Sequence, residues 1–154
     1  MSLEIKLVDH TDPILLGLIA KLDQDLLERY PVEEIHFVDF SDPSVENITF
    51  AVAFEDNVPV GCGALRPIDK ESTELKRFFV DHFYRKQGIA TQLLSFLEKH
   101  AEKRGNRIIR LETGAPQPEA IALYTKYGYY PIDCFGEYIG SKGSLCFEKK
   151  IAAM

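Results

Sequence analysis

The sequence predicts a mixed α/β fold built on one sheet, and three observations support this class. Three strand-like segments follow one another between residues 48 and 80, with short links between them. A long amphipathic helical segment then separates the third of these from another apolar strand segment. A shorter helical segment and two more strand segments follow. This order predicts an antiparallel meander joined to a parallel β-α-β unit, in one domain that spans residues 1–154.

The first part of the chain is predicted to supply a strand, a helix and an irregular segment. Apolar and polar residues alternate over Leu3–Val8, which is typical of a half-buried strand. Asp12 before Pro13 indicates a helix start, because the carboxylate can cap free backbone N–H groups and proline fits the first turn. The helix is expected over Pro13–Arg29. Residues Val32–Glu46 show no clear period, so we expect a short helix or an irregular loop there.

The meander is predicted from residue 48 onward. Apolar residues alternate over 48–54, and Asp56 with Asn57 forms a plausible two-residue hairpin turn. The returning strand is expected over Val58–Arg66. After a short loop, the third strand of the meander is expected over Thr73–Val80.

The crossover unit follows the meander. The long helix is expected over Gly88–Arg104 and should end at Gly105, the residue type that most often follows a helix C-terminus. Arg107–Thr113 is rich in isoleucine and leucine and is predicted to be a strand. Because it follows a strand and a helix, it should lie parallel to Thr73–Val80 and beside it.

The last part of the chain is predicted to complete the sheet. Pro118 opens a second helix within this part, and Gly128 stops it. Two strands are then expected, over Tyr129–Ile132 and Ser144–Lys150. They enclose a glycine-bearing loop that contains Phe135 and Tyr138. We expect these two aromatic side chains to cover the last strands rather than to line a cleft.

Composition and charge limit the classes of function. The net charge of −6 argues against general nucleic-acid binding, which needs a positive surface. No apolar run reaches the roughly 20 residues of a membrane span, and the first six residues lack the apolar core of a signal peptide. The three cysteines, Cys62, Cys134 and Cys146, have no metal-binding spacing, and we expect Cys134 and Cys146 to pack in the core. The expectation is a cytoplasmic protein without a metal, nucleic-acid or membrane partner.

The segment Arg85–Ala90 joins the predicted strand Thr73–Val80 to the long helix. A helix start presents backbone N–H groups without partners and a partial positive charge. Gly88 lets a ligand approach the backbone, while Arg85 and Lys86 add full positive charges. The segment lacks the Gly-Lys-Ser/Thr of a P-loop and the three glycines of a dinucleotide fingerprint. It therefore predicts a site for an anion, most simply a phosphate or pyrophosphate.

Two motifs in the expected order resemble the GNAT superfamily of N-acetyltransferases, in particular its small single-domain bacterial members. The first is Gln/Arg-x-x-Gly-x-Gly/Ala after a strand, matched by Arg85, Gly88 and Ala90. The second is a small residue, Leu-Tyr, three residues and Gly-Phe/Tyr, matched within residues 120–129. The resemblance extends over residues 48–150. It implies the GNAT fold, with central strands that splay apart, and acetyl-CoA as the acyl donor without a metal.

The resemblance also implies where coenzyme A binds. Splayed strands leave backbone groups that pantetheine can satisfy like an added strand. The strand residues implied to bind pantetheine are Phe78, Phe79 and Val80. The residues implied to surround the pyrophosphate are Arg85, Lys86, Gln87, Gly88, Ile89, Ala90 and Thr91. Glu119 stands where the family often has asparagine, so that asparagine's role is not transferred to this chain.

Three residues are candidates for proton transfer. By resemblance, Tyr124 would donate a proton to the departing thiolate, and its phenol has the O–H for this step. A base is needed because an ammonium acceptor must lose a proton before its nitrogen can attack. Glu74 resembles the position of the base in some histone-acetylating relatives, and Glu112 is the alternative, acting through water. Each of these carboxylates could instead pair with basic residues on the sheet.

The acceptor is expected to be a primary amine, most simply of a small molecule, that attacks directly in a ternary complex. Arg66 and Arg77 could bind a carboxylate, which would suit an amino-acid-like acceptor, and Arg29 and Tyr30 could lie at the pocket mouth. Structural roles for these side chains remain the alternative. Other functions kept open are a noncatalytic acyl-CoA-binding or sensing domain and a protein or peptide N-acetyltransferase. Fold analogy also suggests a homodimer.

Overall fold

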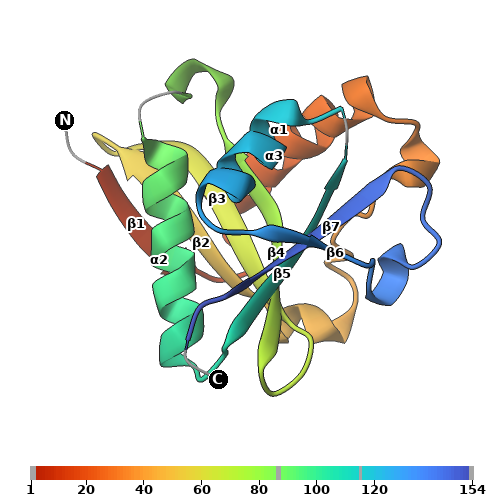
Figure 1. Ribbon diagram of the computed structural model, residues 1–154. Coiled ribbons are helices and arrows are strands. Elements are labelled where there is room, and N and C mark those ends of the chain that lie inside the picture. The colour runs from red at the N-terminus through yellow and green to blue at the C-terminus, as the bar shows by residue number, and fades with distance from the viewer. Residues whose placement is uncertain (1–2, 86–87, 115, 153–154) are drawn as a thin grey trace.

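The computed structural model describes residues 3–85, 88–114 and 116–152, and it confirms the predicted mixed α/β fold (Figure 1). One seven-stranded sheet has the strand order β1-β2-β3-β4-β5-β7-β6. The strands are β1 (Leu3–Val8), β2 (Thr49–Glu55), β3 (Val58–Pro67), β4 (Ser72–Val80), β5 (Ile108–Gly114), β6 (Tyr130–Ile132) and β7 (Ser144–Lys150). The α-helices are α1 (Pro13–Arg29), α2 (Ile89–Lys103) and α3 (Pro118–Lys126).

Four short 3-10 helices complete the described elements. They are η1 (Val32–Glu34), η2 (Pro43–Asn47), η3 (His82–Tyr84) and η4 (Gly136–Tyr138). The first two lie in the region without a clear period, where a short helix or a loop was expected. The expected strands and α-helices are present within one to two residues of their observed ends. No helix in the described part of the chain is both long and apolar enough to span a membrane.

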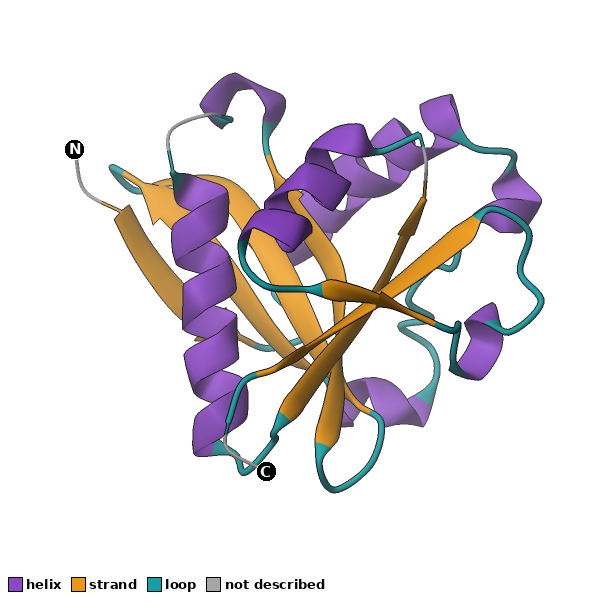
Figure 2. Cartoon of the chain, viewed as in Figure 1, coloured by secondary structure: helices purple, strands orange, loops and turns teal. Residues whose placement is uncertain are grey.

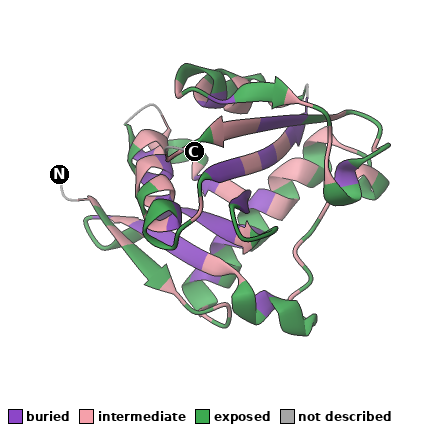
Figure 3. Ribbon diagram, turned by 60° about the horizontal axis from the view of Figure 1, so that its bottom comes forward, coloured by how far each residue is buried: buried purple, intermediate pink, exposed green. Residues whose placement is uncertain are grey.

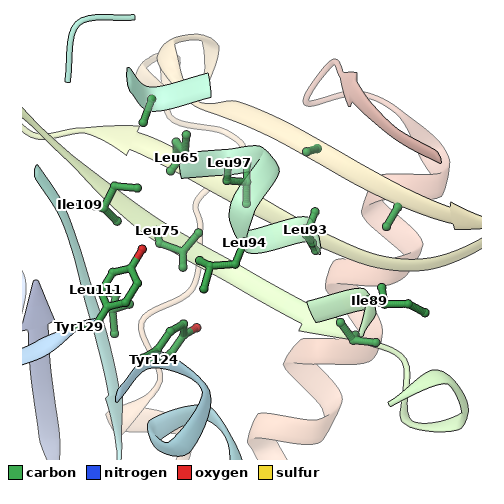
Figure 4. Close-up of a cluster of buried hydrophobic side chains, with 14 of the residues drawn as sticks. Leu65, Leu75, Ile89, Leu93, Leu94, Leu97, Ile109, Leu111, Tyr124 and Tyr129 are labelled. Carbon is green, nitrogen blue, oxygen red and sulfur yellow. The ribbon is translucent and has the colours of Figure 1, made fainter. Parts of the chain in front are cut away.

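The helices cover both faces of the sheet (Figure 2). α1 packs on one face, where its buried stripe meets residues of β2, β3 and β4. α2 and α3 pack on the other face, over a second core cluster that includes Leu75 and Leu111 (Figure 4). Buried residues run along the central strands, whereas the outer helix faces are mostly exposed (Figure 3). The sheet is therefore the middle layer of three.

Local signals in the sequence explain where α1 and the first hairpin begin. The Asp12 side chain accepts hydrogen bonds from the backbone N–H groups of Ile14 and Leu15, so the predicted cap is confirmed. Asp56 and Asn57 have φ values of 49° and 69°, the left-handed pair that a tight hairpin between β2 and β3 requires. Both features are set by residues adjacent in the sequence.

The parallel ladder between β4 and β5 is short, and this feature positions the site. It runs from Ser72 opposite Ile108 to Leu75 opposite Leu111 and then stops. β4 continues to Val80 without β5, while β5 pairs with β7 along its whole length. The two central strands therefore separate, as the family resemblance implied.

A bulge in β4 lies next to this separation. Cys62 of β3 is opposite Phe79, whereas Ala64 is opposite Lys76, so β4 carries one extra residue in this stretch. Arg77 lies within the bulge and has a φ of 50°, in the left-handed region. On β3, a Cβ at Gly63 would come within 2.7 Å of Cδ1 of Leu97 in α2, so a larger residue there would require the Leu97 side chain to move.

Candidate active site

A cavity of about 770 Å³ opens where β4 and β5 separate. Its walls come from α1, the stretch after η1, β4 from Leu75 onward, the start of α2, the end of β5 and α3. Tyr138 of η4 also lines it. Segments that are far apart in the sequence therefore share one pocket, and most of the predicted site residues line it.

The start of α2 forms one end of the cavity. Gly88 caps the helix with a φ of 79°, a left-handed conformation that a side chain would strain. Arg85 donates a hydrogen bond from Nε to the Val80 carbonyl at 3.0 Å. Arg85, Gly88, Ala90 and Thr91 all line the cavity, whereas the Ile89 side chain is buried in the core. Lys86 and Gln87, also predicted to bind the pyrophosphate, lie outside the described residues.

The wall beside this end is the free stretch of β4. Phe78, Phe79 and Val80 line the cavity beyond the last ladder pair, so this stretch has no β5 partner. Backbone N–H and C=O groups at such an edge can bind an extended ligand. The residues present therefore fit a molecule with a charged group at the helix start and an extended chain along β4.

Tyr124 of α3 faces the cavity from the opposite wall. Its ring is packed between Phe78 and Tyr129, with ring centres 6.2 and 5.6 Å away, and the side chain is 6% exposed. Burial raises the pKa of Tyr124 well above its usual value, so the phenol stays protonated at neutral pH. No hydrogen-bond partner for its hydroxyl is found among the described residues. Among the described residues, the hydroxyl is therefore available to donate a proton to a molecule in the cavity.

Glu112 of β5 also lines the cavity. Its carboxylate accepts a hydrogen bond of 2.7 Å from Ser144 Oγ on the neighbouring strand. Burial raises the pKa of Glu112 above its ordinary value, while the Ser144 hydrogen bond opposes the shift. A carboxylate with a raised pKa is a stronger base than an exposed one. Glu112 therefore has the position and the chemistry of a proton acceptor.

Glu74, the other candidate base, is in a different environment. Its side chain is 1% exposed, and it is not among the described residues that line the cavity. One carboxylate oxygen is 2.7 Å from the Arg66 guanidinium, and the other accepts a hydrogen bond from the Tyr138 hydroxyl. The Lys76 ammonium group also lies 3.9 Å from this second oxygen, so both carboxylate oxygens of Glu74 have partners within the protein.

The arginines predicted to bind an acceptor already have partners. Arg66 joins Glu74 to Glu137, and it is not among the described residues that line the cavity. Arg77 lines the cavity, but it donates to Asp23 of α1 at 2.8 Å and to the His36 carbonyl. The bulge thus turns Arg77 toward α1.

At the cavity mouth, α1 and the start of α3 are linked by side chains. Arg29 donates to Glu119 at 2.6 Å, and the Tyr30 hydroxyl donates to Gln117 at 3.0 Å. Both Arg29 and Tyr30 line the cavity, and their role toward an acceptor stays a prediction. Glu119, which stands where the family often has asparagine, is therefore used in an ion pair.

The cavity residues that were not predicted include three with polar side chains near one another: His36, Lys76 and Tyr138. Lys76 is only 5% exposed and donates a hydrogen bond of 2.9 Å to the Tyr138 oxygen. Burial lowers the pKa of Lys76 from its ordinary value. The expectation that Tyr138 only covers the last strands was wrong, because Tyr138 lines the cavity. Phe135 packs its ring against the Tyr138 ring. Strand alternation could have suggested Lys76, but only folding brings η4 over it.

Comparison with known proteins gives the family. The model of the acetyltransferase (GNAT) family matches residues 18–129. An IAA acetyltransferase of Azospirillum brasilense is 38% identical over 87% of this chain and 88% of its own length. An uncharacterized N-acetyltransferase of Bacillus subtilis, YsnE, is 30% identical over 97% of this chain and 100% of its own. The chain therefore belongs to the GNAT family of acetyl-CoA-dependent N-acetyltransferases.

Solved structures agree with this fold. A Klebsiella pneumoniae protein, assigned provisionally as an acyl-CoA N-acyltransferase, has a TM-score of 0.86 and 30% identity, with 97% of this chain and 98% of that chain covered. The PaiA N-acetyltransferase of Thermoplasma acidophilum, solved with coenzyme A, has a TM-score of 0.73 and 24% identity, with 97% and 99% covered. The second likeness shows the fold alone.

Proposed function

We propose that this enzyme transfers an acetyl group from acetyl-CoA to the primary amine of a small molecule, by direct attack in a ternary complex. The observation that carries the proposal is the end of the parallel ladder at Leu75 and Leu111. Beyond that pair, one cavity holds a helix start, a free strand edge, a protonated phenol and a carboxylate. Acetyl-CoA supplies the acetyl group as a reactive thioester.

The proposed donor site uses residues at the start of α2 and along β4. Arg85 and the N–H groups from Gly88 to Thr91 would hold the pyrophosphate, because they combine full and partial positive charge. Lys86, Gln87 and Ile89 belong to the same proposed segment. Phe78, Phe79 and Val80 would hold the pantetheine arm through their backbone. Holding the donor beside the acceptor in this way makes a bimolecular reaction effectively unimolecular.

In the proposed chemistry, Glu112 accepts a proton from the acceptor's ammonium group, the free amine then attacks the thioester carbonyl, and Tyr124 gives a proton to the departing sulfur. Glu112 acts directly or through a water molecule. Burial supports both roles, because it raises the pKa of each group and so favours a basic carboxylate and a protonated phenol. Glu74 remains the alternative base, but its two partners hold it beneath the cavity.

The proposed acceptor binds at the end of the cavity opposite the start of α2. Ile35 and His36, from the stretch after η1, also line the cavity, and the proposal places a small acceptor beside them. Lys76 lines the cavity with an ammonium group that donates to the Tyr138 oxygen and lies 3.9 Å from a Glu74 oxygen, and in this proposal it also meets a carboxylate on the acceptor. An amino-acid-like acceptor with one amine and one acid group fits this arrangement.

A panel of amines tests this proposal. Purified protein with acetyl-CoA is mixed with amino acids, their decarboxylated amines, short peptides and IAA, which the name of the A. brasilense relative gives. Free thiol release is then measured. We expect turnover with small amines that also carry an acid group. Stabilisation by acetyl-CoA without turnover on any amine would favour a sensing domain, and preference for peptides would overturn the small-molecule assignment.

A further inference from the structure

Two cysteines, Cys134 and Cys146, meet at the sheet edge beside the acceptor end of the cavity. Cys146 lies in β7 opposite Ile132 of β6, and Cys134 follows two residues later along the chain. Their sulfur atoms are 2.7 Å apart, and both thiols are free. The pairing of β6 with β7 therefore holds two thiols in direct contact, although they are separated by a loop.

The two thiols differ in their access to solvent. Cys146 is 3% exposed and donates its S–H toward Cys134 Sγ, and burial raises its pKa to about 12. Cys134 is only partly buried, and its Sγ is 3.6 Å from the Ser144 carbonyl oxygen. The third cysteine, Cys62, is fully buried in the cluster beneath α1 and has the Arg77 carbonyl as its partner. An oxidant from solvent therefore reaches Cys134 first.

We propose that Cys134 and Cys146 form a reversible redox site that closes to a disulfide bond when the protein meets a hydroperoxide. The geometry carries this proposal: one accessible thiol, one buried thiol in contact with it, and strands that hold them together. It is independent of the acceptor and of the catalytic roles proposed above.

The reaction balances in two steps. The Cys134 sulfur, after losing its proton, attacks one peroxide oxygen, so the O–O bond breaks and a sulfenic acid forms while the other oxygen leaves as hydroxide and becomes water. The Cys146 sulfur then attacks the Cys134 sulfur, an S–S bond forms, and the sulfenic oxygen leaves as a second water with the Cys146 proton. The two thiols lose two electrons in total, and the peroxide gains them. An added dithiol reverses the change.

The bond would join the start of the loop 133–143 to β7. That loop contains η4, which carries Glu137 and the cavity residue Tyr138. Ser144, which follows the loop, donates to Glu112. The redox site is thus attached to the same loop that closes the acceptor end.

Counting thiols tests the proposal. The reduced native chain is treated with hydrogen peroxide, unfolded, alkylated with iodoacetamide and weighed intact by mass spectrometry. The chain has three cysteines, so the untreated protein takes three alkyl groups. We expect the treated protein to take one group, with peptide mapping placing it on Cys62. Dithiothreitol added before alkylation should restore all three groups.

Cys134→Ser is the matched variant, because it removes the more accessible thiol and keeps a small polar side chain. We expect it to keep both remaining thiols free after the same treatment. Cys146→Ala should instead trap Cys134 as a sulfenic acid, which dimedone labels. Three free thiols after treatment of the native chain would overturn the proposal. So would a bond between two chains, seen as a dimer on a nonreducing gel, or a bond that includes Cys62.

Discussion

Leu75 of β4 and Leu111 of β5 are the last pair of residues that the two central strands share. Both are buried beneath α2 and α3, so the ladder ends inside the core (Figure 4). One residue further along each strand, Lys76 and Glu112 face the cavity. The hydrophobic core between the two strands therefore ends at this pair, and the cavity begins directly beyond it.

The proton-donor role of Tyr124 predicts a loss of rate without a loss of stability. Tyr124→Phe keeps the packed ring and removes a hydroxyl that has no hydrogen-bond partner among the described residues. We expect kcat to fall by about 100-fold, with an unchanged free energy of unfolding in urea. Tyr129→Phe is the matched control, because its hydroxyl donates to Glu98 at 2.8 Å, away from the cavity. Full activity in Tyr124→Phe would remove Tyr124 from the mechanism.

The base role of Glu112 predicts a change in the pH profile. Burial raises the pKa of Glu112, so kcat/KM should be lost as pH falls through that raised value. Glu112→Gln should remove this limb and lower kcat/KM by about 100-fold at neutral pH. A raised carboxyl pKa also means that ionised Glu112 disfavours the folded state above that pKa, and this cost disappears at lower pH. The free energy of unfolding of Glu112→Gln at pH 7 should therefore not decrease.

Glu74→Gln is the comparison for that experiment. It leaves Arg66 and the Tyr138 hydroxyl with a weaker partner in a buried position. We expect the urea concentration at the midpoint of unfolding to decrease. The fall of kcat/KM at low pH should remain. If the fall of kcat/KM at low pH instead disappears in Glu74→Gln and persists in Glu112→Gln, then Glu74 is the base and Glu112 is not.

The anion site at the start of α2 predicts weaker donor binding when its charge is reduced. Arg85→Ala removes a guanidinium that lies beside the helix start and donates to the Val80 carbonyl. We expect Kd for coenzyme A, measured by calorimetry, to rise about tenfold and to depend less on salt. Lys103→Ala, at the far end of the same helix, is the control and should bind normally. Equal effects of both substitutions would indicate only a change in net charge.

The hydrogen bonds of Tyr138 predict a combined effect on stability and on the acceptor. Tyr138→Phe removes a hydroxyl that donates to Glu74 and accepts from Lys76, so two buried charged groups each lose a partner. We expect the free energy of unfolding to fall by about 1–3 kcal/mol, and KM for the acceptor to rise while Kd for coenzyme A stays constant. Tyr130→Phe, an exposed tyrosine bonded to Glu148 on the same sheet, serves as the control. An unchanged acceptor KM would limit Tyr138 to a structural role.

Much of the fold could be predicted because its signals are local. Asp12 before Pro13, the Asp56-Asn57 turn and Gly88 before an apolar stripe each act through their immediate neighbours. The order of strand, helix and strand then gave the crossover unit. These features depend on hydrogen bonds and backbone angles within a few residues, which the sequence displays directly.

The acceptor end could not be predicted in the same way. Arg77 turns toward Asp23 because the strand carries an extra residue, and alternation is lost at a bulge. Tyr138 reaches Lys76 across 62 positions of the chain, through a loop whose path has no periodic signal. The side chains proposed to select the acceptor therefore depend on long-range packing, whereas those proposed to hold the pyrophosphate follow one short motif.

The short parallel ladder also has a consequence for how the molecule opens. In the described part of the chain, strands β1 to β4 are paired with strands β5 to β7 only through the four pairs from Ser72–Ile108 to Leu75–Leu111. Each half has longer ladders within itself, such as the seven pairs of β5 with β7. Under native conditions, amide hydrogen exchange should divide the sheet into two cooperative units. The boundary between these units would pass through the catalytic cavity, so a molecule bound there would slow exchange in both halves at once.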